Sequence, residues 1–203
     1  MNIVQINGGA VGSTGKIMFG ISAVCTDEKQ ETLCAAPEVS SGNKTGRNLY
    51  IIQNNNHRKI NVLLDRITGR HNMHSKIATE RLLKVISGFK PDIIQLHNLH
   101  EAYINLPMLF KYIKKHNIKT VWTLHDCWAF TGHCPYFDIV GCNKWKTGCY
   151  GCPQYKEYPK SLFDNSKYMY RLKKKWFTGV ENMTIVTPSE WLASLVKESY
   201  LKD

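Results

Sequence analysis

The chain has 203 residues and carries 27 Lys and Arg against 16 Asp and Glu, a formal net charge of +11. Hydrophobic residues make up 43% and charged residues 21%, which is typical of a globular chain and excludes disorder as a description of the whole. A domain has roughly 100–200 residues, so we expect one large domain or two small ones. The first residues lack a secretory signal pattern, and no apolar run has the length of a transmembrane helix, so we expect a cytoplasmic protein.

The beginning of the chain predicts a strand, a glycine-rich turn and a helix. An apolar run at residues 2–7 is followed by a glycine-rich stretch at residues 8–15. Ile17, Ile21 and Val24 then recur at helical spacing. This order is typical of the opening of a mononucleotide-binding type of α/β domain.

Strands and helices alternate along the rest of the chain. Further strands are expected at Glu31–Ala36, 49–53, 92–96, 119–124 and Met183–Val186, and helices at about 57–68, 75–89, 102–113 and 162–177, with a polar loop at 40–47. A last helix is expected to begin near Thr187, with Thr187 and Glu190 at capping-box spacing and Pro188 at the first helical position. The continuously apolar strands predict an α/β fold class, a Rossmann-like, mostly parallel sheet with helices on both faces and a long Cys-rich loop insertion, in one domain of residues 1–203.

Each of four unusual segments follows a predicted strand. They are residues 8–15, 97–100, 125–126 and 187–189. Ligands of parallel sheets bind at the carboxyl ends of the strands, so one edge of one sheet would carry all four segments. The sequence therefore predicts a binding site at that edge.

The glycine-rich turn is the first part of this predicted site. It resembles a phosphate-binding loop, but Ala10 stands where that loop needs glycine and Ile17 where it needs Ser or Thr. The glycines either bring helix N-terminal amides close to an anionic ligand or only make a tight turn, and we favour the first interpretation. The residues expected to bind the ligand are Gly12, Ser13, Thr14, Gly15 and Lys16.

The next two segments carry histidines. The pair at positions 97 and 100 is expected to line a substrate cleft; metal ligands or a hydrogen-bonded loop are the alternatives. His125 lies beside Asp126, and such a carboxylate can hold an imidazole in one tautomer that donates to a sugar hydroxyl or a phosphate. No Gly-x-Ser-x-Gly elbow occurs, so a hydrolase triad has little support. The catalytic candidate is His125, and the substrate-binding candidates are His97, Asn98, His100, Asp126 and Ser189.

A dense cysteine cluster lies within the segment 125–159, which has no clear periodicity. Four cysteines, each beside Gly or Pro and the last two forming a Cys-x2-Cys pair, suit a tetrahedral zinc ion that would stabilise the loop: Cys134, Cys142, Cys149 and Cys152. An iron–sulfur cluster, a redox pair and reduced packed thiols are the alternatives. Cys25, Cys34 and Cys127 are expected to be ordinary buried thiols.

Positive charge is concentrated in residues 141–177, which hold nine Lys and Arg but only two acids. Such a face attracts nucleic acid, anionic lipid or phosphorylated small molecules, or it only keeps the surface solvated. Residues 167–175, followed by Trp176 and Phe177, would rest on anionic lipid at about 1 kcal/mol per basic residue, unless they form a solvated helix face.

Four stretches carry a resemblance to a known family. They are Gly12-Ser13-Thr14-Gly15-Lys16-Ile17, Pro91-Asp92-Ile93-Ile94-Gln95-Leu96-His97-Asn98-Leu99-His100, Val121-Trp122-Thr123-Leu124-His125-Asp126-Cys127-Trp128-Ala129-Phe130-Thr131-Gly132-His133-Cys134, and Ile185-Val186-Thr187-Pro188-Ser189-Glu190-Trp191-Leu192-Ala193. In these stretches the chain resembles the N-terminal half of family 4 glycosyltransferases of the GT-B architecture, above all the bacterial polysaccharide-assembly members.

The resemblance implies two Rossmann-like domains that face each other, the first binding the acceptor and the second a nucleotide-sugar. Such enzymes transfer the sugar with retention of configuration and use no metal for the chemistry. The glycine loop lies near the donor phosphates, and the histidine matching His125 contacts the transferring sugar. Acceptors are lipid-linked or polysaccharide intermediates, so peripheral contact with the inner face of the cell membrane is expected. Because the sequence stops at Asp203, we expect the C-terminal donor-binding domain to be absent and the chain to be inactive alone.

The expected function is therefore the acceptor-binding half of a retaining glycosyltransferase. Its expected partners are a nucleotide-sugar, a glycan or lipid-linked acceptor and the missing C-terminal domain, with no nucleic acid and no cofactor except a structural zinc. The alternative is a zinc-stapled basic module for nucleic acid or a protein partner. The nucleic-acid form of this alternative predicts tight, salt-sensitive binding to oligonucleotides.

Overall fold

The computed structural model describes residues 1–38 and 48–202, so the loop predicted at 40–47 lies outside the described residues. The strands are β1 (Asn2–Ile6), β2 (Glu31–Ala36), β3 (Leu49–Ile51), β4 (Ile93–Leu96), β5 (Lys119–Thr123) and β6 (Met183–Val186). The helices are α1 (Gly12–Asp27), α2 (Asn55–Thr68), α3 (Lys76–Phe89), α4 (Leu106–His116), α5 (Ser166–Phe177) and α6 (Glu190–Glu198). Three short 3-10 helices lie in the cysteine-rich segment, at Trp128–Phe130, Phe137–Val140 and Lys144–Lys146.

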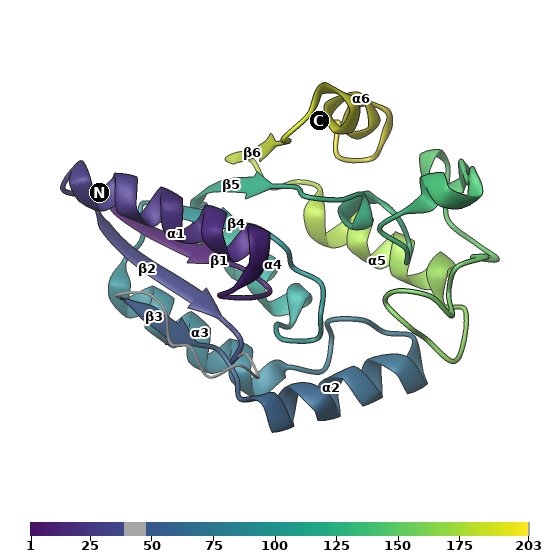
Figure 1. Ribbon diagram of the computed structural model, residues 1–203, viewed down its shortest axis with the longest axis horizontal. Coiled ribbons are helices and arrows are strands. Elements are labelled where there is room, and N and C mark those ends of the chain that lie inside the picture. Colours follow the sequence, from purple (N-terminus) through teal and green to yellow (C-terminus); the bar gives the residue numbers. More distant parts are fainter. Residues whose placement is uncertain (39–47, 203) are drawn as a thin grey trace.

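The six strands form one parallel sheet in the order β3-β2-β1-β4-β5-β6. From β1 the chain first adds β2 and β3 on one side and then adds β4, β5 and β6 on the other side. Ligands of open parallel sheets bind at such a switch point, which here lies between β1 and β4. Figure 1 shows α1 in front of the strands and α3 and α4 behind them. The predicted Rossmann-like α/β class is confirmed.

The strands are apolar because both faces of the sheet are covered. Val4 and Ile6 of β1 are 0% exposed, and Trp122 of β5 is 1% exposed. The Trp122 ring lies 5.6 Å from that of Phe110 on α4 and 4.8 Å from that of Phe177 on α5. Full burial of such a side chain stabilises the fold by about 1.5–3 kcal/mol, so this contact fixes α4 and α5 against β5.

The helix expected from residue 102 begins later, at Leu106. Asn105 caps it, because its side-chain oxygen accepts a hydrogen bond from the Met108 amide at 3.2 Å. Ala102 has a φ of 59° and therefore lies in a left-handed turn before the helix. The prediction placed the start of the helix four residues too early, because it counted Ala102 among the apolar residues at helical spacing.

The predicted start of the last helix is also wrong in detail. Ser189, and not Thr187, is the cap of α6, and its hydroxyl accepts a hydrogen bond from the Leu192 amide at 3.2 Å. Pro188 therefore precedes the cap instead of occupying the first helical position. Only one of the two hydroxyl residues can occupy the capping position, and the helix begins two residues later than predicted.

Helix α1 packs on the sheet through a different face from the one that its apolar residues suggest. Ile17 and Val24 are 42% and 63% exposed. The inward side carries Gly15 and Met18, and the Gln5 side chain donates to the Met18 carbonyl oxygen at 2.9 Å. Glycine lets the helix backbone approach the preceding turn closely, which leaves the apolar residues on the outward side.

The end of the basic segment is buried, so the expected contact of its aromatic residues with lipid is wrong. Trp176 and Phe177 of α5 are 9% and 0% exposed and belong to the core. Lys173 is also buried; its ammonium donates to the Trp128 carbonyl oxygen and lies 3.4 Å from the centre of the Trp128 ring. Burial lowers the pKa of Lys173 to about 7.

Candidate functional site

The glycine-rich turn and the turn after β4 touch each other at the carboxyl edge of the sheet. A Cβ added to Gly8 would lie 3.2 Å from the carbonyl oxygen of Asn98. The amide of His97 donates to the carbonyl oxygen of Ile6 at 2.9 Å, which continues the ladder between β1 and β4. The first two segments singled out in the sequence therefore form one continuous surface.

The glycine-rich turn leads into a helix start that has no side-chain cap. Gly12 is the first residue of α1 and has a φ of 79°, a conformation that favours glycine. A Cβ on Gly15 would lie 2.7 Å from the carbonyl carbon of Ala10, so this position also requires glycine. Among the described residues no side chain caps the helix and its first turn has no acid, so its amides are available to an anion.

His97 and His125 pair at this edge. His97 Nδ1 lies 3.3 Å from His125 Nε2, and the two rings stack with centres 5.6 Å apart. His97 is only 1% exposed, whereas His125 is partly exposed. Burial, and then the neighbouring His125, lowers the pKa of His97 to about 4; burial likewise lowers the pKa of His125. Both imidazoles are therefore neutral at neutral pH.

Hydrogen bonds define which nitrogen of each ring carries the proton. The Gln5 amide nitrogen donates to the Met18 carbonyl oxygen, so its oxygen accepts from His97 Nε2 at 3.3 Å. A neutral His97 then has a lone pair at Nδ1, which accepts from His125 Nε2. The remaining nitrogen of His125, Nδ1, is left with a lone pair.

Asp126 binds His100 instead of its neighbour His125. Its Oδ2 lies 3.0 Å from His100 Nε2, and its Oδ1 accepts from the Trp128 amide at 2.8 Å. Burial tends to raise the pKa of Asp126, but the His100 contact and the Trp128 amide outweigh it, so the net shift is downward. The expectation that Asp126 orients His125 is wrong, because both carboxylate oxygens of Asp126 are hydrogen-bonded elsewhere and His125 pairs with His97.

A polar chain runs outward from His100. The Tyr158 hydroxyl lies 2.9 Å from His100 Nδ1 and donates to Glu101 Oε1 at 3.2 Å. Glu101 in turn forms an ion pair with Arg58 of α2, 2.5 Å between Oε2 and Nη2. This chain joins the turn after β4 to α2 and to the far end of the cysteine-rich segment.

The turn that carries these groups has strained backbone. Glu101 and Ala102 have φ values of 88° and 59°, which residues other than glycine seldom adopt. The Ala102 amide donates to the Asn72 side chain, and its carbonyl oxygen accepts from Gln53 and Ser75. Strain held by so many bonds is typical of a functional turn, whose side chains must point in fixed directions.

A cavity of about 250 Å³ opens beside His100, between α2 and the segment around Tyr158. Its lining combines cations, carboxylates and histidines: Arg58, Arg66, Lys160, Asp65, Glu101, His71 and His100. His71 is 5% exposed, and its Nε2 has no hydrogen-bond partner among the described residues. An unpartnered polar atom that is buried against a cavity indicates a place for a polar ligand group or water.

Buried titrating groups make stability depend on acid. Burial lowers the pKa of His71 to about 3 and those of His97 and His133 to about 4. In the unfolded chain these histidines titrate near 6.5, so between about pH 6.5 and 4 the unfolded state binds more protons. Asp65 acts in the opposite sense, because burial raises its pKa to about 7 and the folded state holds that proton.

We therefore expect the free energy of unfolding to fall as the pH drops below 6.5. Three histidines outweigh one carboxyl group, which gives a slope of about 2–3 kcal/mol per pH unit near pH 5. Urea midpoints at neutral and mildly acid pH measure this slope, and His97→Gln should reduce it. A midpoint that is unchanged or higher in acid contradicts the burial of these histidines.

The four clustered cysteines line one small cavity of about 10 Å³. A hydrogen bond between the Cys134 and Cys152 side chains raises the pKa of Cys134 and lowers that of Cys152. In residues 1–38 and 48–202, however, no three His, Cys, Asp or Glu side chains are grouped so that they could hold a metal ion. The zinc site stays a prediction. Cys34 and Cys127 are buried as expected, whereas Cys25 is partly exposed.

The structure brings most of the predicted site residues to one edge. The glycine turn, His97, Asn98, His100, His125 and Asp126 all follow β1, β4 or β5. Ser189 follows β6 on the same edge, but its hydroxyl caps α6. Sequence reasoning missed four residues of this network: Arg58, Asn72, Glu101 and Tyr158. None of them belongs to one of the four segments singled out after the strands, and the only signal in the sequence was that each is a polar residue.

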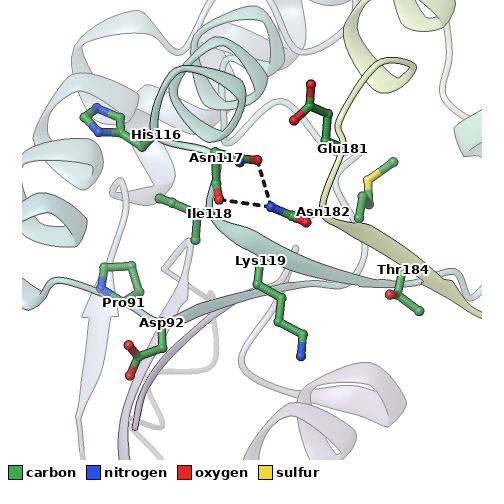
Figure 2. Close-up of a pocket in the computed structure, with 10 residues that line it drawn as sticks. Pro91, Asp92, His116, Asn117, Ile118, Lys119, Glu181, Asn182 and Thr184 are labelled. Atoms are coloured by element: carbon green, nitrogen blue, oxygen red, sulfur yellow. Dashed lines mark hydrogen bonds between the residues drawn. The ribbon is translucent and has the colours of Figure 1, made fainter.

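A second cavity, of about 660 Å³, lies at the opposite, amino edge of the sheet. Figure 2 shows Asn117 and Asn182 joined by hydrogen bonds there, one of 2.9 Å between their side chains, with Asp92 and Lys119 nearby. None of the predicted site residues lines this cavity. Ligands of parallel sheets bind at the carboxyl ends, so the smaller cavity beside His100 is the better candidate.

The protein has a Rossmann-like α/β fold, and polar side chains are grouped at the carboxyl edge of its sheet. No protein-family model matches the chain. It is 32% identical over 117 residues, 54% of its length, to "Putative colanic acid biosynthesis glycosyl transferase WcaC" of Escherichia coli (strain K12). The match covers only 28% of that protein, so the chain spans much less than the length of its relative. Among the described residues, no helix is both long and apolar enough to cross a membrane.

Proposed function

We propose that the chain is the acceptor-side half of a retaining glycosyltransferase of the GT-B architecture. The enzyme would move a sugar from a nucleotide-sugar to a polysaccharide or lipid-linked acceptor, with no metal in the chemistry. The similarity to a glycosyl transferase supports the reaction class. The single observation that carries the proposal is the joining of the uncapped α1 start and the His97–His125 pair at one sheet edge.

The start of α1 is suited to bind the leaving diphosphate of the donor. Amide groups there have no side-chain cap, and the positive end of the helix dipole favours an anion. Gly12 keeps the approach open, since nothing lies within 4 Å of a Cβ added to it. Stabilising charge as it develops on the leaving group is the largest contribution that such a site makes to catalysis.

His125 is assigned to the sugar. Its Nε2 donates to His97, so its Nδ1 accepts a hydrogen bond from a sugar hydroxyl. This direction is opposite to the donation expected from the sequence, because Gln5 and His97 determine the tautomer. His97 is a positioning residue, since it is 1% exposed and acts only through His125.

The acceptor is assigned to the cavity beside His100. Arg58, Arg66 and Lys160 line it together with Glu101 and Asp65, a mixture of donors and acceptors that suits glycan hydroxyls and an anionic group. His100 lines this cavity and is hydrogen-bonded to Asp126, the residue that follows His125. The cavity therefore lies close to the residue assigned to the sugar. A lipid-linked acceptor would also bring the chain to the surface of a membrane.

The test is a transfer assay on the full protein that contains this chain. Radiolabelled nucleotide-sugars are supplied with membrane-extracted acceptors, and the product's anomeric configuration is determined. Transfer with retention supports the proposal. Purified, folded protein that transfers no sugar from any nucleotide-sugar, and yet binds oligonucleotides tightly and with strong salt dependence, would favour the nucleic-acid module instead.

We also propose a structural zinc ion in the cysteine cluster, although the sulfurs are not grouped for it in this structure. A site with four thiolates would carry two negative charges, and Lys173 interacts electrostatically with Cys134 and Cys149. Elemental analysis of reduced protein should find about one zinc per chain, lost in Cys149→Ser but kept in Cys25→Ser. Protein that is folded and reduced but contains no zinc contradicts the proposal.

A further inference from the structure

The cavity beside His100 has a polar floor whose atoms the protein itself leaves unpaired. Three residues form this floor, His71, Asn72 and Asp65, and they are 5%, 1% and 3% exposed. Within residues 1–38 and 48–202, His71 Nε2, Asn72 Nδ2 and Asp65 Oδ1 have no hydrogen-bond partner. Buried polar atoms are ordinarily paired, so three unpaired atoms in residues that line one cavity indicate a polar ligand there.

The unpaired atoms of the floor can donate hydrogen bonds. Asn72 Oδ1 accepts from the Ala102 amide at 2.9 Å, so the free end of this side chain is its NH2 group. Burial raises the pKa of Asp65 to about 7, and its Oδ2 accepts from the Asn72 amide, which leaves Oδ1 to hold the proton. His71 Nδ1 lies 3.8 Å from Asp65 Oδ2, beyond hydrogen-bond distance, so its Nε2 can carry the ring hydrogen. Such a floor suits the oxygen atoms of a sugar ring.

The mouth of the cavity carries an excess of positive charge. Arg58 is neutralised by its ion pair with Glu101. Arg66 and Lys160 also line the cavity, and in the part of the chain that the structure describes neither forms an ion pair. They come from two elements that lie together, because the Leu162 amide donates to the Arg66 carbonyl oxygen at 2.8 Å. Figure 1 shows the segment before α5 at the carboxyl end of α2.

The size and charge of the cavity suit one acidic sugar ring. Its volume of about 250 Å³ lies just below the roughly 300–1,000 Å³ of pockets for drug-sized ligands, so it has room for one ring. A guanidinium and an ammonium group bind a carboxylate by charge-assisted hydrogen bonds. A phosphate would bring a charge of roughly −1.5 to −2 next to the carboxyl groups of Asp65 and Glu101. The singly charged carboxylate is therefore the better match.

We propose that this cavity binds a hexuronic acid residue of the acceptor glycan, with its carboxylate at Arg66 and Lys160 and its ring oxygens on His71 and Asn72. This inference rests on the proposed function and deepens it, because it assigns the acceptor to the class of acidic glycans. Binding of a uronic acid needs neither a nucleotide-sugar nor sugar transfer, so the two proposals can fail separately.

The test is an NMR titration of the full chain with methyl glucuronide and methyl glucoside. These sugars differ only at C6, which is a carboxylate in the first and a hydroxymethyl group in the second. We expect the glucuronide to bind at least about tenfold more tightly, with its largest effect on the side-chain NH2 signals of Asn72. Added salt should weaken the binding of the glucuronide but not that of the glucoside.

Two double variants test the charges. Arg66→Gln/Lys160→Gln should lower the affinity for the glucuronide about tenfold and leave that for the glucoside unchanged, because only the carboxylate needs these cations. The control Arg81→Gln/Lys84→Gln removes the same charge from exposed positions of α3, which do not line the cavity. It should bind both sugars as the unchanged chain does.

His71→Leu separates a binding role from a structural one. The unpaired Nε2 of His71 contributes nothing to folding, so an apolar side chain of similar size should leave the urea midpoint unchanged or raise it. The same variant should bind the glucuronide about fivefold more weakly, since it lacks the donor on the cavity floor. A lower midpoint together with unchanged binding would give His71 a structural role only and would overturn its assignment.

Three further results overturn the proposal as a whole. The first is equal affinity for the two methyl glycosides, or no binding of either. The second is tighter binding of glucose 6-phosphate than of the glucuronide, because the ligand group is then a phosphate. The third is unchanged binding of the glucuronide by Arg66→Gln/Lys160→Gln. Sugar transfer by the full protein with any of these results would leave the proposed function standing without this inference.

Discussion

His125→Ala is expected to lower kcat by about a hundredfold or more, the usual loss when a positioned polar group at the reacting centre is removed. The change should affect kcat more than KM, because the lone pair of His125 contributes when charge develops on the sugar. Stability should change little, since His125 is only partly buried. Initial rates of sugar transfer by the full protein measure both constants, and urea unfolding verifies the fold.

Two variants separate this role from a structural one. His125→Asn keeps a donor toward His97 and an acceptor on the other side, so it should retain more activity than His125→Ala. His116→Ala, at the opposite edge of the sheet, should leave kcat unchanged. If His125→Ala turns over as fast as the unchanged enzyme, the histidine has no part in transfer.

Gly15→Ala is expected to destabilise the protein by about 1–3 kcal/mol, the cost of inserting a methyl group into a closely packed place. Its Cβ would lie 2.7 Å from the carbonyl carbon and 2.9 Å from the carbonyl oxygen of Ala10. These are backbone atoms, so the clash moves the glycine turn itself. Affinity for a nucleoside diphosphate should therefore fall together with stability.

Gly20→Ala in the same helix provides the matched control. Gly20 is exposed, and nothing lies within 4 Å of a Cβ added there. Replacing an exposed glycine in a helix interior by alanine stabilises by about 0.5–1 kcal/mol. Denaturant midpoints should thus move in opposite directions for the two variants. A Gly15→Ala protein at least as stable as Gly20→Ala would refute the close packing of α1 on its turn.

The sheet could be predicted because each strand is a short apolar run followed by a turn signal. Glu31–Ala36 and Met183–Val186 have the predicted bounds, and the others differ by one or two residues. Which face of α1 is exposed could not be predicted, because the spacing of apolar residues identifies a helix but not the side that it buries. That choice depends on Gly15, whose lack of a side chain sets how closely the helix approaches.

The position of the candidate site in the fold could be predicted, but the hydrogen bonds between its residues could not. Parallel strands bring His97 and His125 to one edge, which the order of segments already indicated. The partner of Asp126 could not be foreseen, since Asp126 bonds to His100, which follows β4, and not to the adjacent His125. Tyr158 comes from 58 residues farther along the chain, and no local pattern links it to His100.

The account rests on one binding edge formed by the turns after β1, β4 and β5. Amide and ring resonances of the chain, followed by NMR during titration with a nucleoside diphosphate, test this most directly. The account predicts the largest shifts at Gly12, Ser13 and Thr14, with smaller ones at His125. Shifts confined to Asn117 and Asn182 at the opposite edge, or no shifts at the helix start at any concentration, would contradict it.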